Sequence, residues 1–118
     1  MNGLLLKESL TDMTVLELVQ ITRTETWQVS NAAAYQPAIW NAIYFEAEDS
    51  QADVFAGRFS EALKPQGWYL NASTAMDVYV VFPGKVFKYP RGDTLQREAA
   101  KRYGLSIGIP ASQLDWSE

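Results

Sequence analysis

Three basic side chains come just before a predicted helix and could bind an anion. They are Lys85, Lys88 and Arg91, and the helix is predicted to begin near Asp93. Free backbone N–H groups at a helix start, with arginine and lysine beside them, suit a phosphate or a carboxylate. Asp93 competes with such a ligand, because as an N-cap its own carboxylate would accept hydrogen bonds from those donors. Lysines on an edge strand, where they discourage aggregation, explain Lys85 and Lys88 equally well.

Four acidic residues near the start of another predicted helix could bind Ca²⁺ or Mg²⁺ or act as an acid–base pair. They are Glu46, Glu48, Asp49 and Asp53. Their spacing lacks the glycine-centred loop of calcium sites, and acids near a helix start complement its dipole. We therefore favour a structural role for them and predict no metal, no cofactor and no catalytic residue.

The chain contains no cysteine and no histidine. Disulfides, thiolate nucleophiles, histidine-dependent triads and metal sites built on these residues are therefore excluded. The sequence also has no glycine-rich phosphate loop and no nucleophile elbow. This composition favours a protein that is not an enzyme, without deciding the matter.

Aromatic residues beyond those needed for a core are the strongest indication of a binding surface. If the helices cover one face of a sheet, Tyr44, Tyr69 and Tyr79 could line the other, and tyrosine and tryptophan are enriched in binding hot spots. A second core layer, made with the threonine-rich strand over 20–29, the longest loop and the C-terminal tail, is the alternative. The aromatic residues concerned are Trp27, Trp40, Tyr44, Trp68, Tyr69, Tyr79, Tyr89 and Trp116. The predicted binding residues are Tyr44, Tyr69, Tyr79, Lys85, Lys88, Tyr89 and Arg91.

The hydrophobic pattern indicates which elements position these residues. Alternating β-branched and aromatic residues predict five strands. Apolar spacings of three and four predict two helices, the first with a capping box at Ser50 and Asp53. Helical turns are predicted after Asp12, where a strand start is the alternative, and from Pro110. The strands are expected over 20–29, 39–48, 68–71, 78–82 and 86–89, and the helices over 50–64 and 93–104.

These elements predict an α+β fold. We expect a single domain over residues 1–118, a two-layer sandwich with a mostly antiparallel sheet of about five strands and two helices on one face. A crossover through the 50–64 helix between parallel strands, which would make the sheet mixed, is the alternative. With 47% hydrophobic residues the chain is able to bury a core of its own.

The net charge of −4 is unevenly distributed. Residues 1–63 carry nine acids and three bases, whereas residues 64–118 carry seven bases and five acids. We therefore expect no nucleic-acid binding, but the basic residues between 85 and 102 are compatible with the binding of a small anionic ligand. No apolar run could span a membrane and no secretory signal is recognisable, so a cytoplasmic location is expected. The integrin-type tripeptide Arg91-Gly92-Asp93 is then explained by a turn and an N-cap.

The leading functional hypothesis is a non-enzymatic protein-binding module of the inhibitor or immunity type. Its acidic first half would attract a basic partner and its aromatic residues would anchor it. One alternative is a small-ligand-binding protein or enzyme that uses a carboxylate such as Glu46, with Arg91 or Lys88, on an anionic substrate. The other is a structural homo-oligomer. A protein partner or self-association is expected in the leading case.

Overall fold

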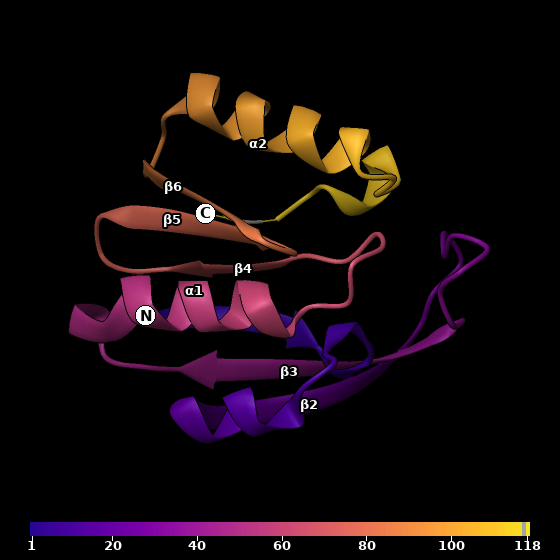
Figure 1. Ribbon diagram of the computed structural model, residues 1–118, viewed down its shortest axis with the longest axis horizontal. Helices are drawn as coiled ribbons and strands as arrows, with labels where there is room; N and C mark the ends of the chain where they lie inside the picture. Colours follow the sequence, from indigo (N-terminus) through magenta and orange to yellow (C-terminus); the bar gives the residue numbers. More distant parts are fainter. Residues whose placement is uncertain (117) are drawn as a thin grey trace.

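The sheet has six strands, and every neighbouring pair is antiparallel. The computed structural model describes residues 1–116 and 118 (Figure 1). Across the sheet the strands are β2 (Gln20–Gln28), β3 (Ile39–Glu46), β1 (Asn2–Leu6), β4 (Leu70–Ser73), β5 (Asp77–Phe82) and β6 (Lys85–Pro90). The predicted α+β class and antiparallel sheet are confirmed, with one strand more than expected.

The additional strand, β1, lies in the middle of the sheet. Its run Leu4–Leu6 is too short to show an alternation, so the pattern did not predict it. β1 pairs antiparallel with both β3 and β4, which therefore run in the same direction on either side of it. Helix α1 (Ala52–Ala62) connects β3 to β4. The crossover between parallel strands exists, but the inserted β1 prevents the mixed sheet that it would have produced.

The two helices cover opposite faces of the sheet, and the expectation of one shared face is wrong. Helix α1 packs against the face of β5 that carries Tyr79 and Val81. Helix α2 (Thr94–Ser106) and the tail after it pack against the face that carries Val78 and Val80. Because successive residues of a strand point to opposite faces, a strand that is apolar at both sets of positions is buried on both sides. In Figure 1, α1 crosses the middle of the sheet, whereas α2 lies beyond the β6 edge strand.

The start of α2 was predicted correctly, but the start of α1 was not. The Asp93 carboxylate accepts a hydrogen bond from the backbone N–H of Gln96 at 3.1 Å, as an N-cap does. Helix α1 instead follows a 3₁₀ turn, η3 (Asp49–Gln51), and its N-cap Gln51 makes no side-chain hydrogen bond. The capping box is therefore wrong, and Asp53 is left for other contacts.

Helix α2 continues two residues beyond Gly104, where it was expected to end. Gly104 is buried inside the helix, because the side chains of Leu114 and Phe82 pack directly on it. The glycine in the left-handed conformation that commonly follows a helix is Gly108, with φ of 92°.

Short 3₁₀ turns complete the fold: η1 (Lys7–Ser9), η2 (Met13–Leu18) and η4 (Ala111–Gln113). The Asp12 carboxylate accepts from the N–H of Thr14 at 2.9 Å, so the predicted helical turn is confirmed there. The longest loop, residues 29–38, joins β2 to β3, and the tail returns after η4 to bury Leu114 and Trp116. Among the described residues, no helix has the length and apolar character to cross a bilayer.

Candidate functional site

Part of one sheet face forms an open groove of about 790 Å³. On the same face, α2 and the tail cover strands β5 and β6. Over β1, β3 and β4 the side chains of that face line the groove instead. The end of β2 with the following residues forms one wall, and tail residues 112–116 with Glu118 form the other.

The floor of the groove carries three neutral polar side chains. The register between β1 and β4 places Asn2 opposite Ser73 and Leu4 opposite Asn71, so all four point to the same face. The side chains of Asn2, Asn71 and Ser73 have no hydrogen-bond partner among residues 1–116 and 118, and none of their polar atoms is buried. Their donors and acceptors are available to a ligand.

Three of the predicted aromatic residues in the groove come from β2 and β3, and a fourth, Trp68, comes from the segment before β4. Trp40 and Trp68 pack edge to face with ring centroids 5.4 Å apart, and the Trp40 indole donates to the carbonyl of Pro37 at 2.7 Å. Both of these tryptophans are buried. Trp27 and Tyr44 are only partly buried, so their rings are the aromatic surface that a ligand can reach.

Tyr44 lies on the face that forms the groove, and two charged residues of β2 hold it there. The Arg23 guanidinium lies over its ring at 4.1 Å from the centroid. The Tyr44 hydroxyl donates to the Glu25 carboxylate at 2.9 Å. The same carboxylate accepts from the Trp27 indole at 3.3 Å. These contacts fix both accessible rings at the rim of the groove.

Amide side chains tie the loop 29–38 to the tail and close one end of the groove. The buried Gln36 and Gln113 exchange two hydrogen bonds, at 3.2 and 2.9 Å. Asn31 donates to the Ser112 hydroxyl at 3.0 Å, and its own carbonyl accepts from Gln113. Figure 1 shows the loop and the tail at the same end of the molecule. The two walls of the groove, the β2–β3 hairpin and the C-terminal tail, are therefore joined at this end.

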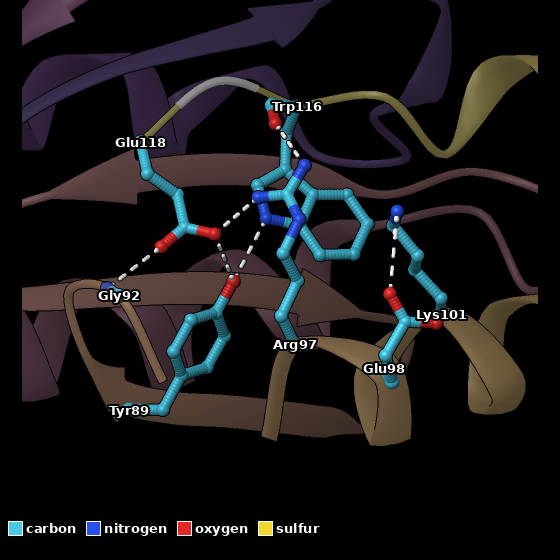
Figure 2. A network of polar contacts seen from close by, with 7 residues as sticks. All are labelled: Tyr89, Gly92, Arg97, Glu98, Lys101, Trp116 and Glu118. Carbon is cyan, nitrogen blue, oxygen red and sulfur yellow. Dashed lines mark hydrogen bonds and ion pairs between the residues drawn. The ribbon is translucent and has the colours of Figure 1, made fainter. Parts of the chain in front are cut away.

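The tail is held by a polar network that includes a predicted binding residue, Tyr89 (Figure 2). Arg97 stacks on the Trp116 ring at 4.7 Å, donates to the Trp116 carbonyl at 2.6 Å and forms an ion pair with Glu118. The buried Tyr89 hydroxyl accepts from the Trp116 indole at 2.9 Å. Glu118 also accepts from the N–H of Gly92 at 3.3 Å. Tyr89 thus holds the tail against the sheet, and its hydroxyl is already engaged.

Tyr69 forms the inner wall of the groove. Its ring packs edge to face on Trp116 at 5.6 Å, and its hydroxyl donates to the carbonyl of Gln113 at 2.5 Å. Burial raises the pKa of the Tyr69 hydroxyl, and the charge of Asp115 raises it further. Tyr69 therefore stays protonated and contributes shape more than charge.

Tyr79 lies on the opposite face of the sheet, under α1, and the expectation that it lines the open face is wrong. Its position in β5 alternates with Val78 and Val80, which point toward the groove side. The Tyr79 hydroxyl donates to Asp53 at 2.6 Å, and Lys88 donates to the same carboxylate at 3.2 Å. The hydrogen bond from Tyr79, followed by that from Lys88, lowers the pKa of Asp53.

The three basic residues ahead of α2 do not converge on one point. Lys85 and Lys88 lie on opposite faces of β6, with Lys85 over the Phe87 ring at 5.4 Å. The Arg91 guanidinium donates to the carbonyl of Thr74 at 2.7 and 3.1 Å, at the rim of the groove. Because β6 is an edge strand, protection of the edge accounts for the two lysines.

The acidic group does not gather at one point either. Glu46, Glu48 and Asp49 border a second hollow beside Phe55, while Asp53 points to Lys88. Within the described part of the chain, no three acidic side chains lie close enough to hold a metal ion.

The floor residues Asn2, Asn71 and Ser73, and the closing amides of Gln36 and Gln113, were missed in the sequence. Isolated asparagines, serines and glutamines carry no local signal, because their role depends on which strands are neighbours. Recognising β1 would have predicted Asn2 and Leu4 on one face, and that was the one signal available.

Comparisons with protein-family models, with curated proteins and with solved structures found no match. The function is therefore argued from the geometry of the groove.

Proposed function

We propose that the protein is a non-enzymatic protein-binding module, of the inhibitor or immunity type, and that the groove is its recognition surface. The observation that carries the proposal is the floor of unpaired amides and a hydroxyl beside two accessible aromatic rings. Asn2 and Asn71 each offer a donor and an acceptor, which match the C=O and N–H groups of a peptide. Trp27 and Tyr44 are of the residue types that dominate binding energy at interfaces.

The charges around the groove favour a basic segment of the partner. Asp115 is exposed on the tail wall, and Glu25, which accepts from Tyr44 and Trp27, lies beside the accessible rings. The cations nearby are already engaged, Arg23 on the Tyr44 ring and Arg91 on the Thr74 carbonyl. An acidic rim steers a basic partner and penalises an acidic one.

The experiment compares two arginine substitutions of this protein as bait in an extract of its own host. Ser73→Arg fills the floor of the groove with a long cation, whereas Glu61→Arg adds the same side chain to the exposed surface of α1, away from the groove. We expect the wild type and Glu61→Arg to retain one partner in a fixed stoichiometry. We expect Ser73→Arg to bind that partner at least about tenfold more weakly, as measured by calorimetry.

Equal affinity of the two variants for the partner would place recognition elsewhere on the surface. Recovery of no partner in a fixed ratio, from extracts of cells grown under varied conditions, would contradict the proposal itself. Thermal unfolding of both variants checks that each remains folded.

A small anionic ligand is the second candidate, because the groove volume of about 790 Å³ lies within the range of small-molecule pockets. Of the residues expected to hold such a ligand, Arg91 lines the groove, whereas Lys88 is on the α1 face. The same extract distinguishes the two candidates. A groove for a small anionic ligand would retain a metabolite, and Arg91→Ala would weaken the binding of that metabolite more than Ser73→Ala would.

A further inference from the structure

Strand β2 is a long edge strand without lysine or proline, and its bulge lies near one end, between Ile21 and Arg23. It pairs with β3 on one side only, and eight of its nine residues are exposed, Trp27 being partly buried. The other edge, β6, is shorter, carries two lysines and a proline, and lies between the two helices. Lysine and proline keep an edge from pairing with another chain, and β2 has neither.

The sequence of β2 is self-complementary about its centre. The five residues Thr22 to Thr26 read Thr-Arg-Thr-Glu-Thr. The threonines are therefore placed symmetrically about Thr24, and Arg23 and Glu25 carry opposite charges at equivalent positions on either side of it. In an antiparallel pair of identical strands centred on Thr24, each Arg23 lies opposite the partner's Glu25, and threonine lies opposite threonine. Opposite charges and threonine pairs are both favourable across antiparallel strands.

Neighbouring registers are excluded by charge or by the direction of the side chains. A pairing centred on Arg23 places two arginines opposite each other, and one centred on Glu25 places two glutamates opposite each other. A pairing centred between two residues would place the groove of one copy on the opposite side of the joined sheet from the groove of the other, because successive side chains of a strand point to opposite faces. The bulge between Ile21 and Arg23 interrupts the regular ladder at Thr22. The regular part of the contact is therefore Arg23 to Glu25, in which two Arg23–Glu25 pairs flank the Thr24 pair.

We propose that β2 pairs antiparallel with β2 of a second copy about a two-fold axis at Thr24, joining two sheets into one. Arg23 and Glu25 point to the groove face, as their register with β3 shows, and form an ion pair of 3.8 Å within the strand, with side chains that are 60% and 40% exposed. Each is therefore within reach of a partner strand without unfolding. Because the axis is perpendicular to the sheet, the two grooves open on the same side of the dimer. This proposal does not depend on what the groove binds.

The first test reverses the charges and measures association by sedimentation velocity over a wide range of protein concentration. Arg23→Glu places like charges opposite each other at both ends of the contact, and so does Glu25→Arg. Each variant alone should dissociate with a Kd at least about tenfold above that of the wild type. Arg102→Glu, which makes the same charge change on the exposed face of α2, should leave the Kd unchanged.

An equimolar mixture of Arg23→Glu and Glu25→Arg should recover wild-type affinity, because each strand then opposes its complement. A single chain that carries both reversals should dimerise like the wild type for the same reason. A wild type that is monomeric throughout, single variants that dimerise normally, or a mixture that fails to recover would each overturn the proposal.

A second test uses the absence of cysteine from the chain. Under mild oxidation Thr24→Cys should form a covalent dimer, since the axis brings each Thr24 opposite the partner's Thr24. Thr26→Cys should do so at least about tenfold more slowly, because a strand rises ~3.3 Å per residue and its copies lie four residues apart. Equal rates for the two variants, or no disulfide with either, would contradict the register.

Discussion

Glu118 shows how a single carboxylate can attach the tail to the sheet. Burial tends to raise the pKa of this carboxyl, but hydrogen bonds from Arg97 and Gly92 outweigh it, so the pKa lies below the ordinary value. Arg97 also holds the Trp116 carbonyl and ring, so the wall of the groove depends on the pair (Figure 2). A loss of either partner should loosen this wall before it affects the rest of the fold.

The pair should make stability depend on pH in the acid range. Because the folded-state pKa of Glu118 is depressed, its contribution is complete above the unfolded pKa and is lost as pH falls through the folded value. Glu118→Gln should therefore cost about 1–2 kcal/mol in the free energy of unfolding at neutral pH. The difference from the wild type should shrink progressively below about pH 4. Urea unfolding of both proteins at a series of pH values measures it.

A constant difference between wild type and Glu118→Gln down to about pH 3 would show that the charge of Glu118 is not what holds the tail. Asp115→Asn, on the same tail segment but without an ion pair among the described residues, is the matched control and should change stability little.

The placement of a binding residue could be predicted where it depends on neighbours in the sequence, and could not be predicted where it depends on distant segments. Tyr44 lies on the groove face, a direction that the alternation along β3 determines. Tyr79 was misplaced, because β5 is apolar on both faces and its alternation does not say which face is covered. The role of Tyr89 depends on a tail 27 residues away, which no pattern near Tyr89 indicates.

At the scale of elements, β1 decides the topology, and Gly3 decides whether β1 fits. A Cβ on Gly3 would lie 2.3 Å from the Phe45 ring and 2.8 Å from the Cβ of Ala72, inside the core under α1. The neighbours are a buried ring and a strand, so the clash cannot be relieved by a flexible side chain. The close approach of β1 to its partners thus requires glycine at this position.

Gly3→Ala should lower the free energy of unfolding by about 2–3 kcal/mol through overpacking. Gly57→Ala provides the matched control, since nothing lies within 4 Å of a Cβ there and the position is inside α1. That substitution should stabilise the protein by about 0.5–1 kcal/mol, because alanine is the better helix former. Equal effects of the two substitutions in chemical denaturation would mean that β1 is not packed in the centre of the sheet.

The elements with strong periodicity were predicted, and those defined by tertiary contacts were not. The β5–β6 hairpin has a glycine with φ of 70° at Gly84, as the Pro-Gly turn required, and the strands on either side pair as expected. β1 has five residues and no alternation, so its pairing with β3 and β4 is what makes it a strand. The start of α1 was misjudged because Asp53 binds Tyr79 and Lys88 instead of capping the helix.

At the scale of the whole molecule, the groove exists because distant segments meet on one sheet face. Its lining comes from β1, the β2–β3 hairpin, β4 and the tail, which are brought together by the sheet order and by the Gln36–Gln113 contact. No local motif could have predicted it. Part of the excess of aromatic residues evident in the sequence is located in the groove, whereas its acidic lining residues, Asp115 and Glu118, come from the tail.

Amide hydrogen exchange of the protein, alone and saturated with the partner that it retains, tests the central claim most directly. If the groove is the recognition surface, binding should slow exchange in β1, β4, residues 27–31 and the tail after Pro110, and leave α1 unchanged. Protection confined to α1, or a pattern that is identical in the presence and absence of the partner, would contradict it.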